Sequence, residues 1–285
     1  VWYKPKALCV LDDCSRLCCH IQWYTDETAE TLFHGLMQAF HKRGLSRALM
    51  TDNGSAMVAH ETQNGLARLS VVHETTLPYS AYQNGKQESF WGQLEGRLLA
   101  MLEHVDPLTL DFLNMSSQAW VEQEYQRKIH EDLGTSPIKK MLEGPDQSRP
   151  SPDSEAIRQA FTQQETRVQR KSDGTISLQG IRFEIPSRFR HMSKIHIRYQ
   201  SWDMSVAYIL DPCSKRIIAR IYPQDKAKNA NGHRKTIEPA VTTRPASADA
   251  DPIPPLLRKI LLDYAATGMP PAYLPVPEKE DLDES

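Results

Sequence analysis

Apolar and polar residues alternate with two different periods in the first part of the chain. Residues 7–12 and 17–24 alternate with a period of two on either side of a polar turn, which predicts a β-hairpin. Residues 28–41 instead repeat apolar side chains at helical spacing, so we expect a helix there. Gly44 is expected to end this helix, because glycine adopts the backbone conformations that helix ends require.

The pattern then continues with short strands and longer helices in turn. Apolar runs predict strands at 47–51 and 70–74. Helices are predicted at 61–69, 110–130 and 138–142, and after Glu88, where Phe90, Leu94, Leu98 and Met101 form one apolar stripe. This order of elements is typical of an α/β domain, which we expect over residues 1–143.

The pattern changes in the second half of the chain. Five short β runs, separated by Gly, Pro and Asp, are expected at 175–178, 181–185, 194–199, 206–210 and 216–222. Short strands of this kind predict a small all-β barrel. We therefore expect a linker at 144–165, the barrel at 166–236, and a Pro-rich, acidic tail at 237–285 with one short helix.

The composition is that of a globular protein, with 40% hydrophobic and 25% charged residues among 285. No apolar run reaches the roughly 18 residues of a membrane span, and no signal-peptide pattern opens the chain. We therefore expect a cytoplasmic protein that does not enter a membrane. The five cysteines are odd in number and form no C-x-x-C pair, so reduced thiols are expected.

The net charge of −2 conceals a strong asymmetry. Residues 167–235 carry a net charge of +10, and the rest of the chain carries −12. A segment this basic favours contact with a polyanion, and double-stranded DNA is the partner that we expect. The candidate DNA-binding residues are Lys86, Arg182, Arg190, Lys194 and Arg198, although an ordinary solvated surface is the alternative for each of them.

Two carboxylates carry the candidate chemistry. Asp52 follows the apolar residues 48–50 within a Thr-Asp-Asn-Gly sequence, and Glu88 comes after 35 further residues. A carboxylate at a strand end and another at the start of a helix are suited to holding divalent metal ions against a phosphodiester. Alone, Asp52 could equally be a turn residue, since Asp-Asn-Gly is a common turn sequence.

Both motifs resemble the catalytic core of the DDE integrase/transposase family. The first is the Thr51–Gly54 sequence, and the second is the P-Y-x5-G-x-x-E sequence of residues 78–88; the spacing matches the D-(35)-E pattern of that family. The resemblance implies a ribonuclease-H-like α/β core, with Asp52 and Glu88 as ligands of two Mg²⁺ or Mn²⁺ ions. The C-terminal β-barrel of Mu-type transposases, which such family members use against DNA, is resembled by four further stretches: Gly180–Phe183, Arg198–Tyr199, Trp202–Asp203 and Tyr222–Pro223.

The family uses three acids, and its first aspartate lies on a strand that would precede residue 7. We therefore expect this chain to be a fragment that lacks its first strand and first catalytic Asp, and to be inactive by itself. Asp12 is the nearest local candidate to replace that Asp. The alternative is that Asp12 belongs to the hairpin turn, because short acids and serine bond neighbouring backbone amides there.

The resemblance implies DNA transposition or integration by phosphodiester hydrolysis and strand transfer. The expected substrates are the ends of a mobile element and target DNA, and a homo-oligomer is expected to bind them. Whether a partner ATPase takes part is left open. Two alternatives remain. One is an inactive DNA-binding module of the same fold, and the other is a metal-dependent nuclease without strand transfer.

Overall fold

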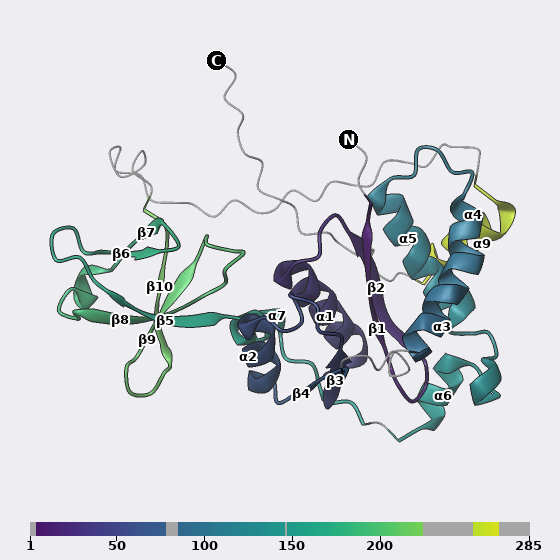
Figure 1. Cartoon of the computed structure of the whole chain (residues 1–285), viewed down its shortest axis with the longest axis horizontal. Helices are drawn as coiled ribbons and strands as arrows, with labels where there is room; N and C mark the ends of the chain where they lie inside the picture. Colours follow the sequence, from purple (N-terminus) through teal and green to yellow (C-terminus); the bar gives the residue numbers. More distant parts are fainter. Residues whose placement is uncertain (1–3, 78–84, 146, 225–252, 268–285) are drawn as a thin grey trace, which may run out of the picture. The chain divides into compact units, whose positions relative to one another are not determined.

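The computed structural model describes residues 4–77, 85–145, 147–224 and 253–267. The chain divides into two compact units. Unit 1 comprises residues 1–157 and 249–285, and unit 2 comprises residues 158–248 (Figure 1). In the described part of the chain, no helix is long and apolar enough to cross a membrane.

Unit 1 begins with the expected antiparallel hairpin. β1 (Lys6–Leu11) pairs with β2 (Cys18–Tyr24), and α1 (Ala29–Arg43) packs on both strands. The packing is close, because the Leu8 side chain occupies the space that a side chain at Gly35 would need. Glycine at this position therefore lets the helix approach the strand.

Capping residues define both ends of α1. Thr28 Oγ1 accepts a hydrogen bond from Thr31 N at 3.3 Å, and Thr31 Oγ1 accepts one from Thr28 N at 3.0 Å. Gly44 follows the helix with a φ of +83°, a conformation that other residues rarely adopt. Both the helix and its predicted end at Gly44 are thus confirmed.

A second, parallel pair of strands follows in unit 1. β3 (Ala48–Thr51) pairs with β4 (Val72–Thr75), and α2 (His60–Arg68) connects them. The strand ladders of the described residues in this unit form two two-stranded sheets, so β1 and β3 each have one edge that no described strand pairs with. The predicted class of mixed helices and sheets is confirmed for this unit.

Helices make up the rest of unit 1. They are α3 (Gly85–Gln93), η2 (Leu94–Leu99), α4 (Ala100–Leu102), α5 (Leu110–Trp120), η3 (Val121–Tyr125), η4 (Glu131–Leu133), α6 (Pro137–Glu143) and α7 (Ser154–Ala160), which leads into unit 2. η2 and η3 are π-helical, with wider turns than an α-helix. The sequence predicted Met101 as the last residue of the apolar stripe that begins at Phe90, but Leu102 is the buried residue. A π-helical turn contains more residues than an α-helical turn, so the stripe continues one residue later.

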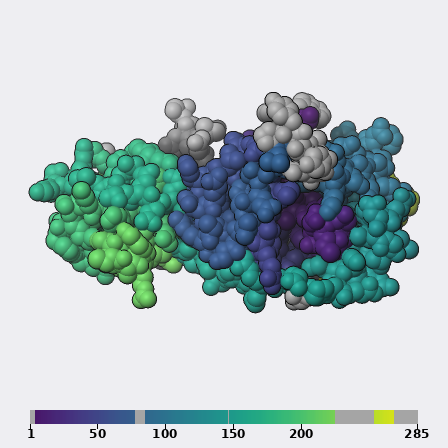
Figure 2. All heavy atoms as spheres, turned by 60° about the horizontal axis from the view of Figure 1, so that its bottom comes forward, coloured from purple at the N-terminus to yellow at the C-terminus, as the bar shows by residue number. Residues whose placement is uncertain are grey.

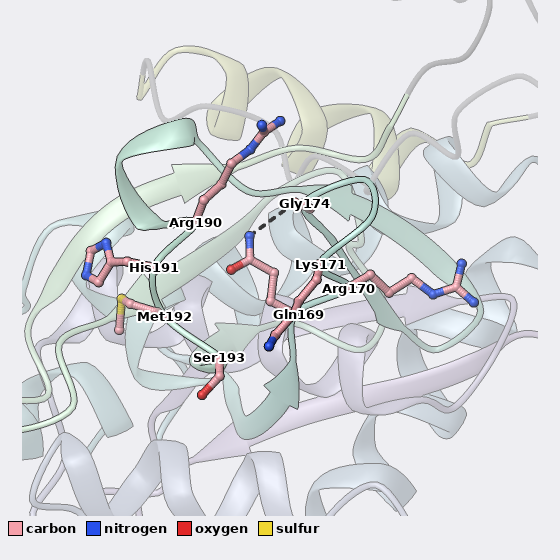
Figure 3. Close-up of a pocket in the computed structure, with 8 residues that line it drawn as sticks. All are labelled: Gln169, Arg170, Lys171, Gly174, Arg190, His191, Met192 and Ser193. Carbon is pink, nitrogen blue, oxygen red and sulfur yellow. Dashed lines mark hydrogen bonds between the residues drawn. The ribbon is translucent and has the colours of Figure 1, made fainter.

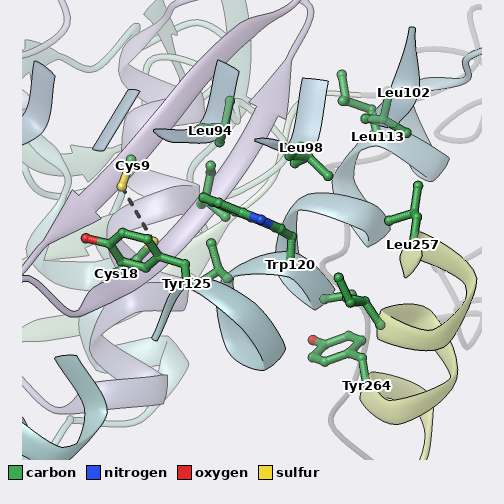
Figure 4. Close-up of a cluster of buried hydrophobic side chains, with 14 of the residues drawn as sticks. Cys9, Cys18, Leu94, Leu98, Leu102, Leu113, Trp120, Tyr125, Leu257 and Tyr264 are labelled. Carbon is green, nitrogen blue, oxygen red and sulfur yellow. Dashed lines mark hydrogen bonds between the residues drawn. The ribbon is translucent and has the colours of Figure 1, made fainter. Parts of the chain in front are cut away.

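α9 (Pro255–Ala265) completes the core of unit 1. Its Leu257, Ile260 and Tyr264 are buried, and the helix packs on α5 and η3 near Trp120 (Figure 4). The sequence predicted a helix here but placed it in a tail. Its apolar residues lie at intervals of three and four, which is the spacing of a helix with one buried face.

Unit 2 is built from strands. They are β5 (Gln163–Val168), β6 (Thr175–Leu178), β7 (Ile181–Glu184), β8 (Lys194–Tyr199), β9 (Ala207–Leu210) and β10 (Ile217–Ile221), with the short helix η5 (Ser187–Phe189) before β8. β10, β9, β8 and β5 form one antiparallel sheet, and β6 and β7 form a hairpin. The five predicted strands are present, and the sequence missed β5.

Backbone hydrogen bonds connect the hairpin to the sheet at both sides. Gln224 N, just after β10, donates to Arg182 O at 2.7 Å, and Arg170 N, just after β5, donates to Thr175 O at 2.8 Å. The hairpin and the sheet therefore enclose one apolar core, in which Phe183 is fully buried.

Candidate active site

Asp52 lies on the surface directly after β3. Its Oδ1 accepts a hydrogen bond from Gly54 N at 2.9 Å, which turns the carboxylate back over the loop. Within the described residues, Oδ2 has no hydrogen-bond partner. Gly54 suits this turn because a side chain there would approach Asp52 Oδ1 to 3.0 Å.

Contacts between the ends of β3 and β4 hold the loop that carries Asp52. Thr51 Oγ1 and His73 Nε2 are 2.9 Å apart, and Asn53 Nδ2 donates to Thr76 O at 2.9 Å. Burial lowers the pKa of His73, which favours the neutral ring. His73 is therefore a hydrogen-bonded residue that contacts the neighbour of Asp52.

Glu88 lies in the first turn of α3, and its side chain is exposed. The helix is fixed from its other side, because Phe90 is only 1% exposed and Gln87 Nε2 donates to Cys9 O on β1 at 3.4 Å. Glu88 is thus presented to solvent by an anchored helix. Residues 78–84, which hold most of the second motif, lie outside the described residues.

Lys86, a candidate for phosphate contact, forms an ion pair in this structure. Its Nζ lies 2.6 Å from Asp13 Oδ1 in the turn between β1 and β2. Both side chains are well exposed, so the pair contributes little to stability. The neighbouring carboxylate nevertheless reduces the positive potential that Lys86 offers to a phosphate.

Asp12 has the hydrogen bonds of a turn residue. Its Oδ2 accepts from Ser15 N at 2.8 Å and from Ser15 Oγ at 2.6 Å. Purple, N-terminal residues reach the surface of unit 1 beside teal ones (Figure 2), and within this turn the buried Ser15 Oγ lies 3.9 Å from Met141 Sδ of α6. The hairpin-turn alternative for Asp12 accounts for these contacts.

The described residues contain no group of three His, Cys, Asp or Glu side chains arranged to hold a metal ion. Asp52 and Glu88 supply exposed carboxylate oxygens, the donors that Mg²⁺ and Mn²⁺ prefer. The donor chemistry therefore fits the expected cation, but a three-acid set is not present in this part of the chain.

The candidate cations of unit 2 lie in different environments. Arg182 Nη1 is 3.9 Å from Asp173 Oδ2. Arg198 is half-buried, its Nε has no hydrogen-bond partner among the described residues, and burial lowers the pKa of its guanidinium. Arg190 and Lys194 are exposed, and neither forms an ion pair within the described chain. Arg190 and Lys194 are therefore more available to an anion than Arg182 and Arg198.

A pocket in unit 2 brings Arg190 together with nitrogen-bearing side chains that the sequence analysis did not select. Arg170, Lys171 and His191 also line this pocket (Figure 3). The feature of the sequence that could have indicated this pocket was the adjacent pair Arg170 and Lys171, shortly before Gly174. The fold was needed to bring this pair next to residues 190–193, because the two segments are separated by the β6–β7 hairpin.

Comparisons with known proteins show where the chain is similar to others. Residues 2–81 match the family model described as the integrase core domain. The magnesium complex of the HTLV-2 integrase catalytic core domain in trimeric form is 20% identical, with 48% of this chain and 84% of that chain covered and a TM-score of 0.41. The catalytic core domain of BIV integrase is 23% identical, with 50% and 88% covered and a TM-score of 0.41.

A longer match is to the simian T-cell lymphotropic virus intasome in complex with PP2A regulatory subunit B56 gamma. It is 16% identical and covers 78% of this chain and 72% of that chain, with a TM-score of 0.45. No curated protein matches the chain.

Proposed function

We propose that this chain, whose residues 2–81 match the family model of the integrase core domain, belongs to the DDE integrase/transposase family and takes part in metal-dependent DNA transposition or integration. Polynucleotidyl transfer is the activity of this family. The finer proposal is hydrolysis at the ends of a mobile element, followed by transfer of the freed strand to target DNA. One observation carries it: the core presents Asp52 at the end of β3 and Glu88 in the first turn of α3, both exposed.

Asp52 and Glu88 would hold Mg²⁺ or Mn²⁺, with two ions in each site. When bound, such ions lower the pKa of the attacking water or hydroxyl and neutralise the leaving oxygen. The residues of the chain position the carboxylates. Gly54 N fixes one oxygen of Asp52, and the buried Phe90 anchors the helix that carries Glu88.

A third carboxylate is needed to hold two metal ions in this chemistry. We propose that it comes from an additional strand that precedes β1 and carries an aspartate. The edges of β1 and β3 that no described strand occupies support a place for such a strand. The hydrogen bonds of Asp12 to Ser15 favour its role in the turn over a role as this acid.

Unit 2 is proposed to hold duplex DNA, and the full protein is proposed to act as a homo-oligomer on DNA. The basic residues of 167–235 support the first of these proposals. Arg190 and Lys194 are the cations of the sequence-based set that we expect to contribute most, because both are exposed.

The test is nicking of supercoiled plasmid DNA with Mg²⁺ or Mn²⁺. We expect the 285-residue chain to bind DNA without nicking it, and a chain extended upstream to nick it. In the extended chain, Asp52→Asn or Glu88→Gln should lower nicking on the order of 100-fold or more, because each removes a metal ligand. DNA affinity and the free energy of unfolding should remain nearly unchanged.

Glu95→Gln is the matched control, since Glu95 is an exposed acid two turns after Glu88 and should not alter nicking. Robust Mg²⁺-dependent nicking by the 285-residue chain would overturn the requirement for a further acid. In that case, loss of nicking in Asp12→Asn would assign the third carboxylate to Asp12.

The absence of a three-acid group in the described residues favours one second candidate, a DNA-binding module without catalytic activity. It predicts that the extended chain binds DNA but never nicks it. A nuclease without strand transfer would nick plasmid DNA but would not join a labelled oligonucleotide to it.

A further inference from the structure

Two loops of unit 2 form a basic pocket of about 160 Å³ (Figure 3). One loop connects β5 to β6, and the other connects η5 to β8. The residues that line the pocket are Gln169, Arg170, Lys171, Gly174, Arg190, His191, Met192 and Ser193. Three of these side chains carry a permanent positive charge, and none carries a negative charge.

Backbone and buried polar contacts fix the shape of the pocket. Gln169 N donates to Ser193 O at 3.0 Å, and Gly174 N donates to Arg170 O at 2.9 Å. The buried Gln169 amide lies between the two loops: in one orientation its Nε2 donates to Gly174 O at 3.5 Å, and in the reversed orientation it donates to Met192 O at 2.8 Å. The walls are therefore held together without the charged side chains, which remain available to a ligand.

Gly174 makes room for Arg190. It has a φ of +67°, and a side chain at this position would come within 3.0 Å of Arg190 Nε. Only glycine adopts this backbone conformation at little cost and also leaves space for the guanidinium group. The lack of a side chain at Gly174 therefore leaves space for the Arg190 guanidinium beside the pocket.

The three cations have no ion-pair partner within the described residues, unlike others in the same unit. Arg158 pairs with Asp203 at 2.9 Å, for example. The acid nearest in sequence, Asp173, accepts hydrogen bonds from Thr175 and lies 3.9 Å from Arg182. The hydrogen bonds from Thr175, and then the charges of Arg170 and Arg182, lower the pKa of its carboxyl, so Arg170 interacts with Asp173 at longer range without forming a salt bridge. In Figure 3 the side chains of Arg190, Arg170 and Lys171 extend in different directions.

We propose that this pocket binds a phosphate group of a nucleic-acid backbone. The proposal rests on the proposed function, in which unit 2 holds DNA, and it names the site of contact. Arg170 and Arg190 each present a planar fork that matches phosphate oxygens, and Lys171 adds a third positive charge. The Ser193 hydroxyl and the His191 ring line the same pocket and offer further donors. The site would position DNA and would not read its sequence.

The experiment measures duplex DNA affinity of the full chain by fluorescence anisotropy over a range of salt concentrations. The pocket variant is Arg170→Gln with Arg190→Gln. The matched control is Lys215→Gln with Arg216→Gln, which removes two exposed cations of the β9–β10 turn in the same unit. We expect the pocket variant to lose affinity about 10-fold and to lower the salt slope by about 1, as for one lost phosphate contact.

The control variant should lose less than about 3-fold, because its charges act only through the general field. If both variants lose affinity equally, the contact is diffuse and the pocket is not a phosphate site, although unit 2 still binds DNA. If neither variant loses affinity, the DNA-binding role proposed for unit 2 is itself wrong. Unchanged thermal melting of both variants establishes that folding is not the cause.

The variant Arg190→Lys distinguishes the contribution of the guanidinium shape from that of the positive charge. It keeps the positive charge but loses the fork, so an affinity between those of the original chain and the pocket variant is expected. A second arm uses inorganic phosphate at constant ionic strength. If phosphate binds the pocket tightly while the pocket variant retains full DNA affinity, the ligand is a free phosphate and the nucleic-acid proposal is overturned.

Discussion

His20 of β2 is buried beside Gln118 of α5, with 2% of its surface exposed. Its Nε2 lies 3.1 Å from Gln22 Oε1, and its Nδ1 lies 3.4 Å from Gln118 Nε2. Burial, and then the nearby positive charge of Lys42, lowers the pKa of His20 from 6.5 to about 3, against the opposing effect of its hydrogen bond to Gln22. The native structure therefore favours the neutral ring.

This shift predicts a loss of stability in acid. Between pH 6.5 and about 3 the unfolded chain binds a proton at this residue and the native chain does not, so the free energy of unfolding falls as the pH falls. The loss should approach about 1.4 kcal/mol per pH unit. In urea unfolding at pH 7 and pH 5, His20→Gln should reduce this difference. His104→Gln, at an exposed histidine, should leave it unchanged; an equal effect of both variants would contradict the assignment.

The sequence was sufficient to select Asp52 and Glu88 as candidates, because a short motif and its spacing are local properties. It could not reveal that Lys86 pairs with Asp13 or that Arg198 is half-buried, because both depend on segments far apart in the chain. The pocket cation Arg170 was missed for the same reason.

At the scale of elements, the strands and helices with strong apolar patterns were predictable, and those without them were not. β5 is Gln163–Val168, and almost all of its residues are polar, so its pattern did not stand out from a linker. The π-helical η2 changed the spacing of the buried stripe. Such a change depends on packing against neighbouring helices and has no simple signature in the sequence.

α9 allows a direct test of its place in the core. Leu257→Ala should lower the free energy of unfolding by about 2–5 kcal/mol, because Leu257 is fully buried and the substitution leaves a cavity. Leu262→Ala is the matched control in the same helix, since Leu262 is 66% exposed, and it should cost less than about 0.5 kcal/mol. Urea unfolding measures both. Similar small effects would show that α9 does not contribute to the core in solution.

At the scale of the whole molecule, charge is distributed unevenly between the two units. DNA affinity of the full chain should therefore fall steeply with salt, because phosphate contacts release condensed counterions. Arg190→Glu with Lys194→Glu should weaken binding to all sequences and lower the salt slope by about 2. Arg198 is left unchanged, since reversal of a half-buried charge would also alter stability.

The control variant reverses two exposed lysines of unit 1, by Lys139→Glu with Lys140→Glu. These changes should have a much smaller effect on affinity, measured by anisotropy at several salt concentrations. If they weaken DNA binding as much as the reversals in unit 2, then unit 1 is also a main DNA-binding surface and the charge argument is wrong.

Because α9 belongs to unit 1, unit 2 is inserted within the sequence of unit 1 and is not a separate C-terminal domain. The chain leaves unit 1 after residue 157 and enters it again for α9, so two covalent connections join the units. One proteolytic cut in either connection would leave the fragments associated through the packing of α9. Removing everything after β10 would also expose the apolar surface that Leu257 and Tyr264 cover, so unit 1 cannot be isolated cleanly by shortening the chain from its C-terminal end.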